Sequence, residues 1–121
     1  MLDRRDRYAL DDMRYWALQA TQIASGRARE DLETDRLLAP ALQYALIVLG
    51  EAAGRVSEAF QEQYPQIPWG SIIGMRNVLV HGYDKTNLAI VWRAVTSDLP
   101  ALVADLDGIL DAESGTSQET P

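Results

Sequence analysis

The sequence contains no cysteine and a single histidine, and both scarcities restrict its chemistry. Without cysteine the chain forms no disulfide and has no thiol nucleophile or thiolate metal ligand. One histidine argues against a histidine-based zinc site, because such sites normally need several imidazole or thiolate ligands. We therefore expect neither a bound metal nor a cofactor.

The chain also lacks any apolar run that approaches the roughly 20 residues of a membrane span. Its first residues mix arginines with aspartates, and no apolar signal-peptide stretch follows them. With 121 residues, 47% of them hydrophobic, the length suits one domain with a genuine core. We expect a cytoplasmic protein without membrane contact.

Positive charge is scarce, since 11 Lys and Arg stand against 18 Asp and Glu and the net charge is −7. Nonspecific binding of nucleic acid normally rests on a basic surface. The segment 70–93 departs from this acidic average, because it contains three basic residues, Arg76, Lys85 and Arg93, and one acidic residue, Asp84. A small basic site on an acidic body suits a selective enzyme, or a protein whose basic partner docks elsewhere.

Apolar residues recur at helical spacing along almost the whole chain, and no strand-like alternation competes with them. Four helical stripes cover residues 8–24, 38–60, 69–81 and 88–109. Ser25-Gly26 ends the first stripe, Pro68 is suited to begin the third, and Pro100 predicts a bend in the fourth. A polar connector, residues 27–33, separates the first two.

Four amphipathic helices joined by short connectors predict an all-α, up-and-down bundle over residues 1–112. Residues 113–121 are mostly Ser, Thr, Gly and Glu without apolar anchors. This composition predicts a disordered C-terminal tail.

The densest chemistry lies in residues 76–83, Arg-Asn-Val-Leu-Val-His-Gly-Tyr. A histidine exchanges protons near neutral pH, with an unperturbed pKa of about 6.5, and an arginine presents a fork that matches phosphate. Arg76 and His81 together suit metal-free attack on a phosphodiester. Positions five apart lie about 140° around a straight helix, so the two side chains would not share a face. Either the helix loosens near Gly82, or a second copy of the chain completes the site.

A lone carboxylate, Glu51, stands in the middle of the apolar stripe 38–60. A carboxylate buried there needs a partner, and Arg55 one turn later is the local option. In the other interpretation, Glu51 orients Arg76. The sequence leaves both interpretations open.

Six blocks follow one another in order between residues 5 and 112. They are Gly50-Glu51-Ala52-Ala53-Gly54-Arg55-Val56-Ser57, Tyr64-Pro65-Gln66-Ile67-Pro68-Trp69, Ile72-Ile73-Gly74-Met75-Arg76-Asn77, His81-Gly82-Tyr83, Val91-Trp92 and Asp98-Leu99-Pro100. This series resembles the HepT family, part of the HEPN group, once catalogued as a domain of unknown function. HepT proteins are toxins of toxin–antitoxin modules.

The resemblance implies an all-α homodimer whose Arg-x4-6-His motif, here Arg76 and His81, forms a metal-independent RNase site at the interface. His81, with its symmetry mate, would serve as acid and base, and Arg76 would stabilise charge on the phosphoryl oxygens. Asn77 would assist by hydrogen bonding, although an ordinary surface asparagine is an open alternative. The resemblance further implies a nucleotidyltransferase antitoxin like MntA that attaches AMP to Tyr83.

Two alternatives to the ribonuclease interpretation remain at this point. One is a non-catalytic helical dimer that serves as a scaffold for the nucleotidyltransferase or as a nucleotide-binding module, which the overall acidity favours. The other is toxicity by a route other than RNA cleavage. Arg76, Asn77, His81 and Tyr83 favour the enzyme, because a scaffold has no physical need of them.

Overall fold

A computed structural model of the chain describes residues 2–82 and 87–118. Every regular element in these ranges is helical, which confirms the prediction of an all-α bundle. In chain order the elements are α1 (Arg4–Ala24), α2 (Asp31–Thr34), α3 (Leu38–Arg55), α4 (Glu58–Gln63), α5 (Trp69–His81), α6 (Leu88–Arg93), the π-helical turn η2 (Ala94–Asp98) and α7 (Leu99–Gln118).

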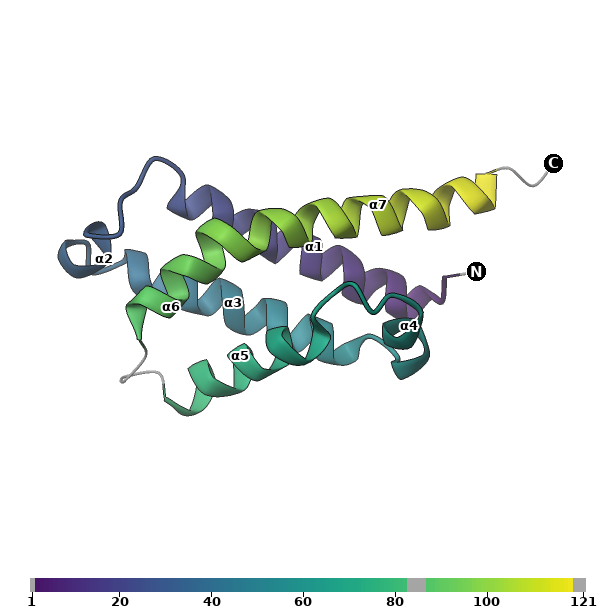
Figure 1. Ribbon diagram of the computed structural model, residues 1–121, viewed down its shortest axis with the longest axis horizontal. Coiled ribbons are helices and arrows are strands. Elements are labelled where there is room, and N and C mark those ends of the chain that lie inside the picture. Colours follow the sequence, from purple (N-terminus) through teal and green to yellow (C-terminus); the bar gives the residue numbers. More distant parts are fainter. Residues whose placement is uncertain (1, 83–86, 119–121) are drawn as a thin grey trace.

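The four long helices α1, α3, α5 and α7 run alternately up and down, and the two ends of the chain lie at the same end of the bundle (Figure 1). Helix α3 packs against both α1 and α5, and α7 packs against α1. No helix in the described ranges is long and apolar enough to cross a membrane.

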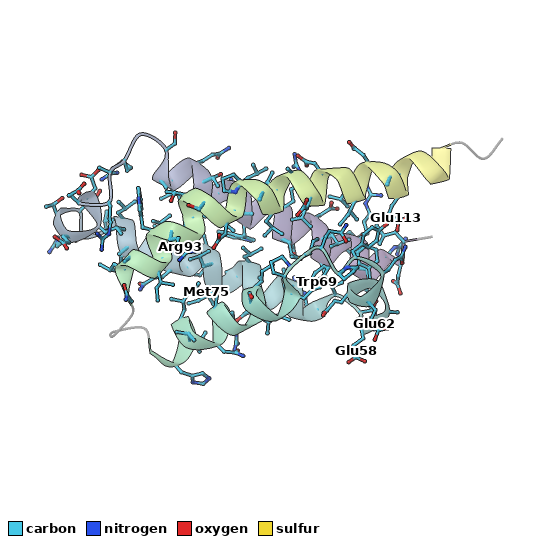
Figure 2. All side chains as sticks on the ribbon, in the orientation of Figure 1. Glu58, Glu62, Trp69, Met75, Arg93 and Glu113 are labelled. Carbon is cyan, nitrogen blue, oxygen red and sulfur yellow. The ribbon has the colours of Figure 1, made fainter. Side chains whose placement is uncertain are left out.

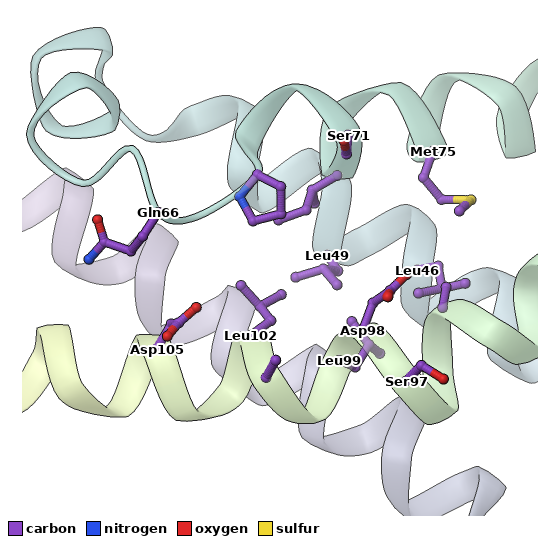
Figure 3. A pocket seen from close by; sticks show the side chains of 14 residues that line it. Leu46, Leu49, Gln66, Ser71, Met75, Ser97, Asp98, Leu99, Leu102 and Asp105 are labelled. Atoms are coloured by element: carbon purple, nitrogen blue, oxygen red, sulfur yellow. The ribbon is translucent and has the colours of Figure 1, made fainter.

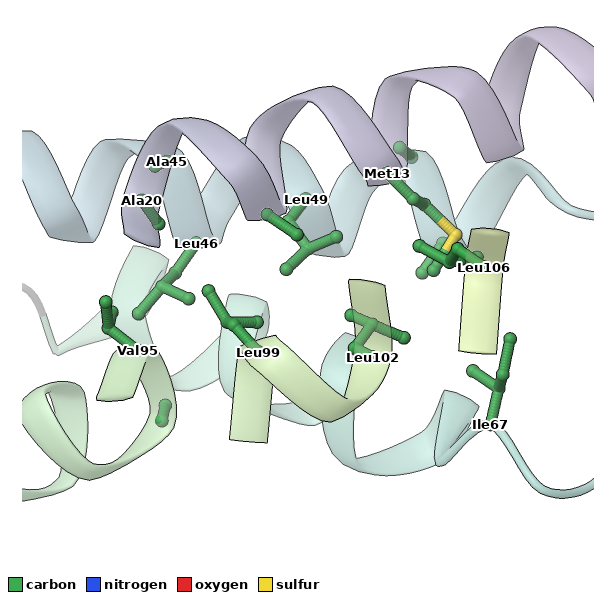
Figure 4. Close-up of a cluster of buried hydrophobic side chains, with 14 of the residues drawn as sticks. Met13, Ala20, Ala45, Leu46, Leu49, Ile67, Val95, Leu99, Leu102 and Leu106 are labelled. Carbon is green, nitrogen blue, oxygen red and sulfur yellow. The ribbon is translucent and has the colours of Figure 1, made fainter. Parts of the chain in front are cut away.

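The core lies where α1, α3 and α7 meet (Figure 4). Leu10, Met13, Leu42 and Leu106 are fully buried there. Alanines at helical spacing on α1 and α3 let these helices approach closely, and buried leucines each contribute about 1.5–3 kcal/mol to the free energy of folding. The apolar stripes recognised in the sequence are therefore the helix faces that are turned toward this core.

Helix α1 ends where the sequence predicts, with Ser25 as its C-cap and Gly26 at a φ of 74°. The predicted helix over residues 38–60 is wrong at its end, because α3 stops at Arg55 and a separate α4 follows. The cause is Ser57, whose hydroxyl accepts a hydrogen bond from the Phe60 N–H (3.2 Å) and caps α4. The buried Asp6 carboxylate accepts from the Ser57 N–H (2.8 Å) and hydroxyl (2.7 Å), which fixes the break against α1.

The polar connector between α1 and α3 contains a short helix, α2, that the sequence pattern did not predict. The Arg27 guanidinium holds this segment together by donating to Asp35 (2.6 Å) and Asp31 (3.5 Å). The hydrogen bond from Arg27, supported by the Leu37 backbone N–H, lowers the pKa of the Asp35 carboxyl.

The predicted stripe over residues 88–109 forms one helical run with a π-helical turn where the bend was expected. The Leu99 N–H donates to the carbonyl of Ala94, five residues earlier. Pro100 explains the widened turn, because its ring would collide with the carbonyl of residue 96 in a regular α-helix. The Thr96 hydroxyl donates to the Trp92 carbonyl (2.8 Å) within the same run.

Helix α7 continues past residue 112, the predicted end of the folded domain, to Gln118. The Tyr64 hydroxyl donates to the Glu113 carboxylate (3.3 Å), and Arg7 donates to the Ser114 hydroxyl (3.3 Å). Burial, followed by the charge of Glu113, raises the pKa of Tyr64. The predicted disordered tail begins at residue 113, within the last part of α7, and residues 119–121 lie outside the described ranges.

Candidate active site

Helix α5 carries both Arg76 and His81, and it covers residues 69–81 as the sequence predicts. Its first turn is anchored by Trp69, which is buried and donates its indole N–H to the Tyr64 carbonyl (3.0 Å). Farther along, Leu79 is fully buried. The side chains of Trp69 and Met75 lie between α5 and the C-terminal helices (Figure 2). Apolar anchors thus fix the rotation of α5 about its axis.

Helices α3 and α5 approach each other closely at Gly50. A Cβ atom added to Gly50 would lie 2.2 Å from the Arg76 Cβ and 3.1 Å from the Ile72 carbonyl oxygen. Only glycine fits this contact without moving α5. This role of Gly50 was not predicted from the sequence. A glycine inside an apolar helix is the signal that could have indicated it.

The Arg76 guanidinium lies across α3 and is already paired within the chain. It donates to the Glu51 carboxylate (3.3 Å) and to the Asn77 side-chain oxygen (3.0 Å). The Arg76 side chain is 31% exposed and that of Glu51 is 47% exposed. The guanidinium is therefore held in one place while part of it stays open to solvent.

Glu51 is paired with Arg76 and not with Arg55, which settles the alternative that the sequence left open. Arg55 instead donates to Asp12 on α1 (2.9 Å) and has no contact with the Arg76 pair. Glu51 is exposed, because α3 turns this position toward solvent. The structure thus brings Glu51, Arg76 and Asn77 together and places Arg55 apart.

His81 is the last residue of α5, and its side chain is exposed. Gly82 forms the C-cap, with its N–H donating to the Val78 carbonyl (2.8 Å), so α5 stays regular through His81. The helix does not loosen before His81, which removes one of the two predicted ways of uniting the pair. Five residues of regular helix separate Arg76 and His81 by about 140°. Tyr83 lies outside the described residues.

Near the candidate site, α5 and α6 present apolar side chains to solvent. Val78 is 63% exposed, Val80 41% and Ile90 53%. On α5, Gly70 and Gly74 have no neighbour within 4 Å of an added Cβ. The face of α5 that carries these two glycines is therefore open. Among the described residues, no group of three or more His, Cys, Asp or Glu has the geometry to hold a metal ion.

Residues 15–109 match the family described as Ribonuclease HepT-like, which covers most of the chain, and the chain belongs to this family. This membership confirms the resemblance recognised in the sequence.

Named relatives of the chain include three proteins whose names describe a ribonuclease. It is 33% identical to "Putative RNase TTE0752" of Caldanaerobacter subterraneus subsp. tengcongensis over 73% of this chain and 79% of that protein. It is 29% identical to "Putative RNase MJ1380" of Methanocaldococcus jannaschii, over 60% of this chain and 67% of that protein. It is 33% identical to "Probable ribonuclease HepT" of Thermococcus cleftensis, over 60% of this chain and 66% of that protein. No solved structure matches the chain.

Proposed function

We propose that this protein is a metal-independent endoribonuclease, the toxin of a toxin–antitoxin module. The observation that carries the proposal is the Arg76 guanidinium, which is held at the α3–α5 contact by Glu51 and Asn77 and remains partly open to solvent. A fixed guanidinium suits the phosphoryl group of RNA, because its fork matches two phosphate oxygens at once. Membership in the HepT-like ribonuclease family supports the same activity.

The site is completed by a second copy of the chain. Arg76 and His81 lie about 140° apart around a regular helix, so they do not converge on one phosphate within a single chain. The exposed Val78 and the open Gly70 and Gly74, which follow one another four residues apart on one face of α5, offer a surface on which another helix packs closely. In a symmetric homodimer, two α5 helices would place Arg76 of one copy near His81 of the other.

The reaction begins when a ribose 2′-hydroxyl attacks the adjacent phosphorus. His81 of one copy removes the 2′-hydroxyl proton, and His81 of the second copy protonates the departing 5′-oxygen. The new bond joins O2′ to phosphorus, the bond to O5′ breaks, and the products are a 2′,3′-cyclic phosphate and a 5′-hydroxyl. Arg76 stabilises the charge that builds on the phosphoryl oxygens, and Asn77 orients Arg76.

Glu51 acts as a positioning residue for Arg76. A carboxylate at 3.3 Å keeps the guanidinium extended across α3, at the point where Gly50 allows α5 to approach. Glu51 also competes with phosphate for the same N–H donors. It therefore weakens the binding of anions to Arg76.

Control of the toxin rests on a cytoplasmic nucleotidyltransferase antitoxin like MntA. This enzyme would transfer AMP from ATP to the Tyr83 phenol, forming a phosphodiester and releasing pyrophosphate. Tyr83 follows His81 by two residues, so the added negative charge would lie beside the site and repel RNA phosphates.

A second candidate is a non-catalytic helical dimer that serves as a scaffold for the nucleotidyltransferase. The pairing of Arg76 with Glu51 favours it, because this pair leaves little net positive charge at the site of a chain that carries −7. A scaffold would be indifferent to the loss of His81, which separates the two candidates.

The deciding experiment is cleavage of labelled total RNA by the purified chain in excess EDTA. We expect wild-type protein to yield fragments ending in 2′,3′-cyclic phosphate, and Arg76→Ala and His81→Ala to lose about 10²–10³-fold in rate. Arg36→Ala, which removes an exposed arginine from the connector before α3, is the matched control and should cleave like the wild type.

Equal cleavage by all four proteins, or products ending in a 3′-hydroxyl, would rule out this mechanism. Absence of cleavage by unmodified wild type would favour the scaffold. Intact-mass measurement of the same sample identifies protein that already carries AMP at Tyr83.

The antitoxin proposal has its own test. Tyr83→Phe, expressed with the nucleotidyltransferase, should stay toxic and unmodified in the mass spectrum, whereas the wild type gains the mass of AMP and loses toxicity. Silencing of Tyr83→Phe to the wild-type extent would exclude Tyr83 as the acceptor.

A further inference from the structure

A groove of about 460 Å³ lies between α5 on one side and η2 and α7 on the other (Figure 3). Three helical segments each line it with two large apolar residues three positions apart. These pairs are Leu46 and Leu49 of α3, Ile72 and Met75 of α5, and Leu99 and Leu102 of α7. The repeated spacing of three residues places each pair on one helix face, which is how helices present side chains to another helix.

The groove exists because the bundle is closed on three sides and open on the fourth. Helix α1 packs against α3 and α7, and α3 packs against α5, but α5 and α7 do not pack closely on each other. In a complete four-helix bundle each long helix contacts two neighbours. The open side therefore has a floor of four leucines that are already buried, and the half-buried Ile72 and Met75 are the apolar side chains that another helix would contact.

The rim on the α7 side is acidic. Asp98 and Asp105 are exposed and line the groove (Figure 3), and their separation of seven residues spans about 10 Å along the helix axis. Ser97 and Asp98 belong to η2, so the π-helical turn before Pro100 forms one end of this rim. Among the described residues that line the groove, none is lysine or arginine.

We propose that the groove is the docking site for a basic amphipathic helix of a protein partner. Apolar residues of that helix at i, i+3 or i+4, and i+7 would fill the space between the apolar side chains of α3, α5 and α7. Lysines or arginines about two turns apart on the same helix would pair with Asp98 and Asp105. The charge of the whole chain, −7, would steer such a partner toward the groove.

Charge and composition both select this occupant over the chain itself. A second copy placed symmetrically on this groove would bring its own acidic rim against Asp98 and Asp105, and like charges facing each other oppose association there. The C-terminal residues 113–121 contain no large apolar side chain that would fill the leucine-lined space. The groove and its occupant do not depend on RNA cleavage.

The test uses a stapled helical peptide of about 15 residues with leucines at i, i+3 or i+4, and i+7, flanked by lysines two turns apart. A second peptide has the same leucines with glutamates in place of the lysines. Binding is followed by NMR of methyl-labelled methionine in the full chain. The Met75 methyl reports on the groove, and the fully buried Met13 methyl is an internal control for unfolding.

We expect the lysine peptide to bind with one-to-one stoichiometry and to shift Met75 while Met13 stays in place. The glutamate peptide should bind at least about tenfold more weakly. The double variant Asp98→Lys/Asp105→Lys should reverse this preference. Glu62→Lys/Asp111→Lys, with the same charge change on exposed residues away from the groove, should keep the wild-type preference.

Equal binding of both peptides, or a Met75 signal that neither peptide moves, would overturn the proposal. A Met75 shift that depends on protein concentration without peptide, together with dimers that the double variant abolishes, would assign the groove to a second copy and also overturn it. The comparison of two peptides on the wild-type chain remains decisive even if the double variant does not fold.

Discussion

Helix α3 has two neighbours, α1 and α5, and the two contacts differ in kind. Against α1 it presents a dense apolar surface, where Leu42, Ala45 and Ala52 are fully or almost fully buried. Against α5 it presents Gly50 and Glu51, and the contact there includes a partly exposed ion pair with Arg76.

The difference separates stability from chemistry within one helix. The α1 side buries apolar area, which is the main source of folding free energy. The α5 side leaves the charged groups of Arg76 and Glu51 partly accessible to solvent. Four substitutions examine this division, beginning with the largest expected effect.

Leu42→Ala tests the α1 side. Because Leu42 has no exposed surface, the substitution leaves a cavity and should lower the free energy of unfolding by about 2–5 kcal/mol. Urea denaturation followed by circular dichroism measures the change. Leu37→Ala, at a side chain that is 79% exposed, should change it by about 0.5 kcal/mol or less. Similar losses for both would remove the distinction between core and surface.

Gly50→Ala tests the α5 side. The added Cβ would lie 2.2 Å from that of Arg76, so α5 must move, at a cost of about 1–3 kcal/mol. The rate of RNA cleavage should fall even at temperatures where the variant stays folded, because the guanidinium is displaced from Glu51.

Gly54→Ala on the same helix is the matched control for Gly50→Ala. No atom lies within 4 Å of the added Cβ, and the helix should gain about 0.5–1 kcal/mol. Thermal melts and the RNA assay on both variants give the comparison. Full activity in Gly50→Ala would mean that the close approach of α3 and α5 does not position Arg76.

Asp6→Asn tests how α1 fixes the end of α3. The amide has one acceptor oxygen, so one of the two hydrogen bonds from Ser57 is lost, at about 0.5–1.5 kcal/mol. Asp3→Asn, at the N-cap of α1, should be neutral, because asparagine caps helices as well as aspartate does. Chemical denaturation of both variants decides, and an equal loss in the two would contradict a special role for Asp6.

Asp35→Asn has the smallest expected effect and concerns the connector between α1 and α3. The hydrogen bond from Arg27 lowers the pKa of Asp35 in the folded chain, so the unfolded chain takes up the proton first as the pH falls. The stability from this pair is present above the unfolded pKa of about 3.9 and is lost as the pH falls through the lower folded pKa.

The measurement is Tm as a function of pH for wild type and Asp35→Asn. The wild type should melt higher at pH 7, and the difference should shrink below about pH 4. A difference that stays constant down to strongly acidic pH would show that Asp35 acts without its charge.

Much of the fold follows from local patterns that are readable in the sequence. The bounds of α5 and the end of α1 at Ser25 and Gly26 agree with prediction, because apolar spacing and Pro or Gly at helix ends act over a few residues. The features that the sequence pattern did not predict depend on distant contacts. The break after Arg55 requires Asp6 from α1, and the extension of α7 to Gln118 brings Glu113 to Tyr64 and Ser114 to Arg7.

The sequence by itself determined the all-α class, the placement of Arg76 and His81 on one helix, and the family, because these depend on residue order and helical period. Tertiary structure alone decided the partner of Glu51, the contact of Gly50 with Arg76, and the groove between α5 and α7. Each of these joins residues from different helices, and their meeting depends on how the helices rotate and pack to bury their apolar faces.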